Sequence, residues 1–187
     1  MSKEPDPRRL DIRRLAEEGT LLAGELRLDA LPRLREEAAG ADPGTPVTWQ
    51  ASASLGARPG QRGRPLLRLA IGATLPLTCQ RCLQPVAVPL VVERAFRFEA
   101  TEEAAAAEDE LSDDEDVLVE SRRFDLLELV EDELVMALPV VPRHDTCPHP
   151  MPLSSVDPAF ERAQDAREHP FAALERLKNR PGGDTGL

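Results

Sequence analysis

The sequence has 187 residues (20.5 kDa), a length that suits one domain with tails, and its 41% of hydrophobic residues allow a modest core. Only 3% of the residues are aromatic and 18 are prolines, so the core is built from Leu, Val and Ala, and a long helical bundle or coiled coil is excluded. The formal net charge of −11 argues against a nucleic-acid partner, but this charge is unevenly distributed along the chain. Residues 102–116 hold nine acids and no base, whereas residues 43–92 hold five arginines and no acid, so a nucleic-acid partner stays possible.

The N-terminus and the cysteines indicate a cytoplasmic protein. Charged residues run through the N-terminal segment, which is not the pattern of an export signal. The longest uncharged run, 43–57, has 15 residues, fewer than the roughly 20 apolar residues that a membrane helix needs. Three cysteines, an odd number, are not typical of a secreted disulfide framework, so we expect reduced thiols.

The first third of the chain predicts short helices around an extended segment. The sequence predicts a helix over 11–18 and a second helix over 31–39. Between them, alternation of apolar and polar residues predicts an extended segment over 20–28. Alternation of apolar and polar residues then predicts three strands, over 47–55, 66–78 and 86–98. The last two strands are separated by a short polar segment, which favours an antiparallel hairpin with Cys-Gln-Arg-Cys at its tip.

The second half combines mobile segments with one strong helix. The acidic segment 102–116 is predicted to be a mobile insertion, followed by a short strand over 117–119. Asp125 to Leu138 predicts a helix that Asp125 caps and Pro139 ends. A Pro-rich irregular segment over 142–158 precedes terminal helices, the last of which begins at Pro170.

These elements predict an α+β fold, in which a twisted antiparallel sheet is covered by the 125–138 helix and the terminal helices. We expect a single domain over residues 1–180 and a disordered tail over 181–187.

Two thiols at a spacing of three, Cys79 and Cys82, can chelate one metal ion on a tight turn, as in zinc knuckles. His144 and Cys147 repeat the spacing and complete a candidate Cys₃His zinc site. No cofactor is certain from this pattern, since the alternative is that the cysteines are buried or incidental residues. A thioredoxin-type redox motif is a further alternative, but such motifs begin a helix and strands flank this one.

Arginines of the predicted 57–65 loop and the hairpin tip are candidates for contacts with RNA phosphates: Arg58, Arg62, Arg64 and Arg81. The alternative is that these arginines only keep the loops soluble. Phe96 and Phe98 share a strand face with apolar residues, so we expect them in the core and not stacked on bases.

The sequence gives little support for catalysis, and we do not expect an enzyme. It contains no phosphate-binding loop, zinc-protease motif or nucleophile elbow. The acids of the strong helix, Glu128, Glu131, Asp132 and Glu133, are interpreted as a solvated or partner-facing surface.

Three blocks resemble the YceD family, the large ribosomal RNA subunit accumulation proteins: LTCQRCLQPV, FDLLELVEDELVMALPVVPRHDTC and HPFAALERLKNR. The residues that carry the resemblance include Cys79, Arg81, Cys82, Asp125, Leu126, Glu131, Asp132, Glu133 and Pro139. The resemblance implies a cytoplasmic bacterial factor for synthesis, processing or stability of 23S ribosomal RNA, without a known enzymatic activity. Some members of the family carry a fuller set of cysteines that resembles a zinc ribbon, whereas this sequence has Cys147 flanked by His144 and His149.

The expected partner is therefore 23S ribosomal RNA, its precursor or a pre-ribosomal particle, and neither a membrane nor DNA. The alternative is an acidic escort that binds a basic large-subunit ribosomal protein and does not contact RNA, which the nine-acid run motivates. A third hypothesis is a thiol-redox enzyme, which requires a depressed thiol pKa at Cys79 or Cys82.

Overall fold

The computed structural model describes residues 5–56, 63–110, 116–149, 155 and 157–165. The chain divides after His149 into two units, and the first contains the whole sheet. The single domain over residues 1–180 with a tail over 181–187 stays a prediction, and the helix expected from Pro170 lies outside the described residues.

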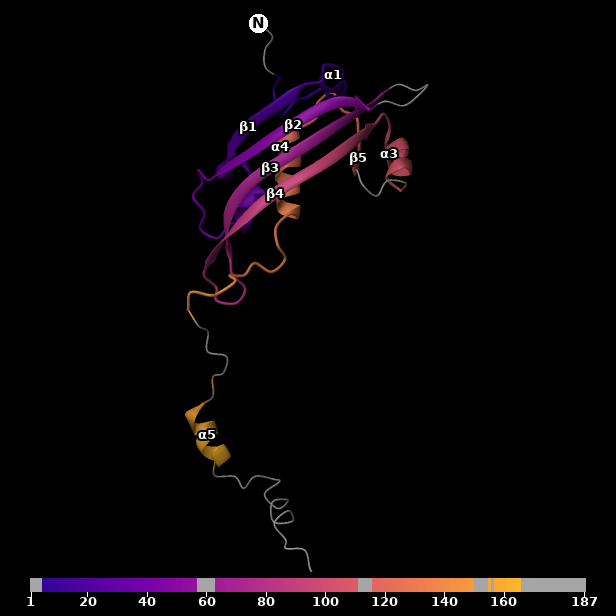
Figure 1. Cartoon of the computed structure of the whole chain (residues 1–187). Helices are drawn as coiled ribbons and strands as arrows, with labels where there is room; N and C mark the ends of the chain where they lie inside the picture. The colour runs from indigo at the N-terminus through magenta and orange to yellow at the C-terminus, as the bar shows by residue number, and fades with distance from the viewer. Residues whose placement is uncertain (1–4, 57–62, 111–115, 150–154, 156, 166–187) are drawn as a thin grey trace, which may run out of the picture. The chain divides into compact units, whose positions relative to one another are not determined.

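Five strands form one open sheet in which every strand lies beside its neighbour in the sequence (Figure 1). They are β1 (Leu21–Arg27), β2 (Pro46–Gly56), β3 (Arg64–Thr78), β4 (Pro85–Glu99) and β5 (Asp116–Val119). The first four strands pair antiparallel; the sequence predicts this for β2, β3 and β4, and the structure adds β1 at the edge. β5 pairs parallel to β4. A parallel pair needs a crossover connection, and this one contains a helix. The sheet is therefore mixed, and the α+β class is confirmed.

The helices are α1 (Ile12–Glu17), α2 (Pro32–Glu37), α3 (Glu102–Asp109), α4 (Leu126–Met136) and α5 (Pro158–Asp165), with a 3-10 turn η1 (Leu28–Ala30). The predicted cap of α4 is confirmed: Asp125 Oδ1 accepts hydrogen bonds from the N–H groups of Leu127 and Glu128, both at 3.0 Å. α4 lies across one face of the sheet, behind the strands in Figure 1.

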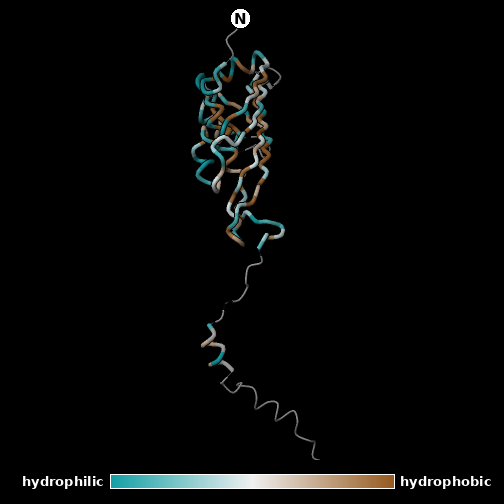
Figure 2. The backbone as a smooth tube through the Cα atoms, turned by 90° about the vertical axis from the view of Figure 1, so that its left-hand side faces the viewer, coloured by the Kyte–Doolittle hydropathy of each residue, from teal (hydrophilic) through white to brown (hydrophobic). Residues whose placement is uncertain are grey.

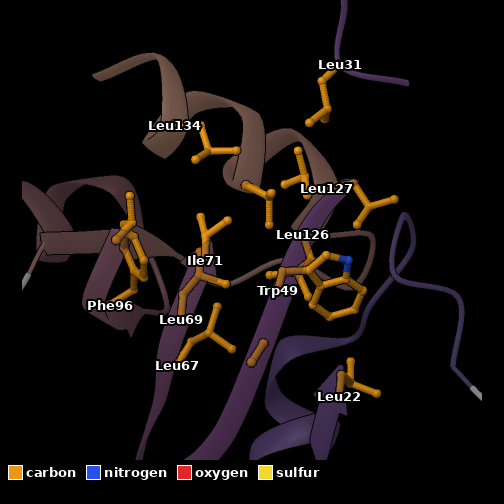
Figure 3. Close-up of a cluster of buried hydrophobic side chains, with 14 of the residues drawn as sticks. Leu22, Leu31, Trp49, Leu67, Leu69, Ile71, Phe96, Leu126, Leu127 and Leu134 are labelled. Carbon is orange, nitrogen blue, oxygen red and sulfur yellow. The ribbon is translucent and has the colours of Figure 1, made fainter. Parts of the chain in front are cut away.

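The core fills the space between the sheet and the helices on that one face. In Figure 3, leucines of α4 lie over strand side chains that include Trp49, Leu69 and Ile71. The alternation in β3 explains this one-sided burial, because residues 65, 67, 69, 71, 75 and 77 are buried while Arg68 and Ala70 between them are exposed. Phe96 and Phe98 are also buried, so their predicted place in the core is confirmed. From the side, the outermost segments of the layer opposite the sheet are hydrophilic, and hydrophobic segments lie between them and the sheet (Figure 2).

The acidic segment contains a helix that the sequence analysis did not expect. The side chain of Thr101 accepts a hydrogen bond from the N–H of Ala104 at the start of α3. Four consecutive alanines and two first-turn acids favour a helix at this place. Ala105 is buried, and Glu108 binds Arg64 at 3.0 Å. The mobility of residues 102–116 stays a prediction, and 111–115 lie outside the described residues.

Two acids of α4 are buried, so their interpretation as surface residues is wrong. Glu131 accepts hydrogen bonds from the N–H groups of Arg33 (2.7 Å) and Leu34 (3.3 Å), and it pairs with the Arg33 guanidinium at 3.2 Å. It thereby caps the first turn of α2 from a neighbouring helix. Glu133 lies 3.5 Å from Arg94 of β4; burial raises its pKa, and the positive charge of Arg94 opposes that shift.

We expect Glu131→Gln to lower the free energy of unfolding by about 1–3 kcal/mol, because it weakens charge-assisted hydrogen bonds to buried N–H groups. Glu128→Gln, an exposed position on the same helix, is the matched control and stays near the wild-type value. Urea unfolding measures both variants. Equal midpoints for the two would contradict the cap across helices.

Candidate metal centre

The hairpin between β3 and β4 ends in a tight turn that holds both cysteines of the CQRC motif. The N–H of Leu83 donates to the carbonyl of Cys79 at 2.9 Å, and the N–H of Cys79 donates to the carbonyl of Gln84 at 3.0 Å. Leu83 has φ +60°, a left-handed conformation that closes the turn although it is unfavourable for a side chain of this kind. The turn therefore directs the thiols of Cys79 and Cys82 toward the same place.

The chain that follows α4 returns to this turn and brings the second pair of ligands. In Figure 1 the segment after α4 runs to the end of the β3–β4 hairpin. The N–H of Gln80 donates to the carbonyl of Pro142 at 2.8 Å, which fixes the segment against the turn. His144 and Cys147 follow directly, so the structure brings together all four residues of the candidate site.

The spacing of the four donor atoms is compatible with a tetrahedral zinc site. The thiol sulfurs and an imidazole nitrogen of Cys79, Cys82, His144 and Cys147 all lie within 4.8 Å of one another. A zinc ion with Zn–S bonds of about 2.3 Å and Zn–N bonds of about 2.0–2.1 Å places two sulfurs about 3.8 Å apart, and a sulfur and a nitrogen about 3.6 Å apart. The Cys79 and Cys147 sulfurs are 3.9 Å apart, and the Cys82 sulfur lies 3.5 Å from His144 Nδ1. The residues therefore fit zinc.

The second nitrogen of His144 has a partner that orients the ring. His144 Nε2 lies 3.1 Å from the carbonyl oxygen of Pro85, which can only accept a hydrogen bond. Nε2 therefore carries the proton, and Nδ1 presents its lone pair to the cluster. Metal-bound histidines are oriented in this way by main-chain carbonyls.

The electrostatics of the cluster act in opposite directions on the thiols of Cys79 and Cys82. Burial raises the pKa of Cys79, but main-chain N–H groups of His144, Cys82 and Arg81 outweigh it and lower that pKa to about 5. For Cys82, the main-chain hydrogen bond at Gln84 lowers the pKa, while burial and the neighbouring thiols raise it above the ordinary value. A dication relieves this repulsion between closely spaced thiolates.

The depressed pKa of Cys79 does not make the CQRC motif a redox site of the thioredoxin type. The Cys79 side chain is 0% exposed, and reactive cysteines need access to their substrates. Strands β3 and β4 flank the motif, whereas a thioredoxin motif begins a helix. Four protein donors would also leave no open position on a tetrahedral ion, which is typical of a structural site.

The family model described as "Large ribosomal RNA subunit accumulation protein YceD" matches residues 67–178. The chain belongs to the YceD family. The match includes β4, α4 and all four residues of the cluster, while α1, β1 and β2 precede it. No solved structure matches this chain.

Several residues of the YceD motif cap helices, lie in the core or form ion pairs in this structure. Asp125 caps α4, Leu126 is fully buried, and Glu131 caps α2. Asp132 binds Arg33 at 2.5 Å, and Pro139 follows the last turn of α4. These contacts give each of these motif residues a role in stabilising the fold.

Two of the four candidate RNA-binding arginines, Arg64 and Arg81, lie toward opposite ends of β3. Arg64 begins β3 and pairs with Glu99 at 2.5 Å, whereas Arg81 follows the other end of that strand. Fifteen residues of strand separate the two ends by roughly 45 Å. Arg58 and Arg62 lie outside the described residues.

Within the described ranges, no helix is both long and apolar enough to cross a membrane.

We expect the purified chain to hold about one zinc ion, and His144→Asn to release it, because the substitution removes one of four donors. His149→Asn is the matched control, since this neighbouring histidine is exposed and outside the cluster. Elemental analysis after dialysis measures the stoichiometry. Zinc retained equally by both variants would contradict the ligand assignment.

Proposed function

We propose that the protein is a non-catalytic assembly factor that supports the synthesis, processing or stability of 23S ribosomal RNA by binding precursor RNA or a pre-ribosomal particle in the cytoplasm. The observation that carries this proposal is the match to the YceD family, whose description names accumulation of the large-subunit RNA. The closed ligand set of the cluster supports a structural role for the metal and not a catalytic one.

The zinc ion would act as a cross-link in this proposal. Cys79 and Cys82 belong to the tip of the β3–β4 hairpin, and His144 and Cys147 belong to the chain after α4. When bound, zinc stabilises the folded chain by its binding free energy. The two ligand pairs would thereby keep the segment after α4 at one end of the sheet.

The β2–β3 connection is the proposed place of RNA contact. It contains Arg58 and Arg62 and no acid, in a chain that is acidic overall. Arg64 at its end is already paired with Glu99 and Glu108, so its charge is largely compensated. Arg81 likewise contacts groups of its own chain, so we assign the proposed phosphate contacts to Arg58 and Arg62.

Replacing Arg58 and Arg62 together by Gln is expected to weaken binding to large-subunit RNA about tenfold and to reduce the salt slope by one to two units, as roughly one counterion is released per phosphate contact. Titrations of RNA fragments at several salt concentrations measure both quantities. Arg14→Gln with Arg27→Gln is the control, because these exposed arginines pair with Glu18 and Asp29. An unchanged slope in the loop variant would exclude this loop as the contact.

The exposed acids of α3 favour a second candidate function, an escort for a basic large-subunit ribosomal protein. Glu102, Glu103, Asp109 and Glu110 are all exposed at this helix. Opposite charges across an interface speed association and select partners. Within this candidate function the protein would reach the ribosome with its cargo and would not touch RNA.

The escort is tested by neutralising these four acids (E102Q, E103Q, D109N and E110Q). Deleting 102–116 is less informative, because it also removes Glu108 and the start of β5. We expect at least tenfold weaker capture of basic ribosomal proteins with RNA binding intact. The control neutralises four other exposed acids: Glu17, Glu36, Glu37 and Glu128. Equal capture by both quadruple variants would reject a specific acidic surface on α3, and tighter, less selective RNA binding would indicate an acidic shield.

A further inference from the structure

Arg81 lies between the two cysteines of the hairpin turn but contacts the other half of the cluster. Its Nε donates to the Cys147 sulfur at 3.0 Å, and its Nη2 donates to the carbonyl of His144 at 3.0 Å. The same Nη2 lies 3.4 Å from the carbonyl of Asp145. One guanidinium therefore binds a ligand atom and the main chain of the ligand segment.

The charge of the cluster explains why a cation is useful there. Three thiolates and a neutral imidazole around Zn²⁺ leave one negative charge in excess. Cys79 is 0% exposed and Cys82 is 8% exposed, so water reaches these sulfurs poorly. An uncompensated charge in such a place is costly. In the described part of the chain, Arg81 is the arginine whose side chain reaches a sulfur of the cluster.

The shape of the guanidinium matters as much as its charge. Arginine presents donors in a rigid plane, which here serve a sulfur and a carbonyl at the same time. Lysine places a compact charge on a flexible stem and does not reproduce this pair of contacts. A guanidinium also stays charged at every physiological pH, so the compensation is permanent.

We propose that Arg81 is a positioning residue of the metal centre, which compensates the excess negative charge of the Cys₃His ligand set and holds the His144–Cys147 segment against the CQRC turn. This role rests on the proposed zinc site, and it replaces the role of a phosphate contact for this residue. Substitutions that disturb hydrogen-bonded neighbours of metal ligands typically cost 10–100-fold in metal affinity.

The test compares zinc retention by the full chain and three variants in competition with a chromophoric chelator. We expect Arg81→Gln to lower the zinc affinity 10–100-fold and Arg81→Lys to lie between it and the wild type. Arg143→Gln is the matched control, because this exposed arginine adjoins His144 without a contact to the ligand atoms, and we expect wild-type retention. With Co²⁺ in place of zinc, the thiolate absorption bands of Arg81→Gln should shift relative to the control.

A second measurement separates a role at the metal from a general structural role. Urea unfolding is expected to show a smaller difference in midpoint between the wild type and Arg81→Gln for the metal-free proteins than for the zinc-loaded proteins, because only the loaded centre carries the excess charge that Arg81 compensates. Equal loss of stability with and without zinc would overturn the proposal, as would wild-type zinc affinity in Arg81→Gln. If the wild type itself holds no zinc, the metal centre fails and the role of Arg81 fails with it, an outcome distinct from a zinc site that is insensitive to Arg81.

Discussion

The pairing of β3 with β4 is the constraint on which the rest of the structure depends. The two strands match at thirteen positions, from Leu66 opposite Arg97 to Thr78 opposite Pro85. A shift of one residue would turn every side chain to the other face, so Leu67, Leu69 and Ile71 would leave the core. The register therefore fixes the surface on which α4 packs and the place where the hairpin turns.

The length of this hairpin keeps two polar clusters apart. At one end Arg64 pairs with Glu99 and Glu108, which holds α3 beside the sheet. At the other end the CQRC turn meets the chain after α4. Neither cluster can reach the other, so the two ends of the sheet act as separate surfaces. Any partner that contacts both must extend along the whole strand.

The sequence predicts the elements well because their signals are local. Alternation in β2, β3 and β4 and the Asp125 cap of α4 need only neighbouring residues. The grouping of Cys79, Cys82, His144 and Cys147 was also predictable, because both pairs repeat one spacing. The buried positions of Glu131 and Glu133 were not, since their partners Arg33 and Arg94 lie far away in the sequence.

The parallel pairing of β5 with β4 and the proposed role of Arg81 also depend on residues that are distant in the sequence. The sequence indicates a strand near residue 117 but not its direction, which depends on how the chain crosses over through α3. Arg81 is a basic residue in a turn until the segment around Cys147 arrives beside it. The charge of Arg81 alone therefore favoured a phosphate contact, and only its tertiary contact with Cys147 indicates a role at the candidate metal centre. The packing of Trp49 in β2 is similar: its ring lies against Gly24 of β1, where an added Cβ would come 2.7 Å from the ring.

The separation of the ligand pairs along the chain has a consequence for folding kinetics. Within each pair two residues lie between the ligands, whereas Cys82 and His144 are 62 positions apart. Closing a loop of this length costs entropy before any contact across it forms. The sheet and α4 supply that closure, since they place both segments at one end of the β3–β4 hairpin. We therefore expect the four-residue centre to be completed late in folding, and a bound ion would chiefly slow unfolding instead of starting the collapse.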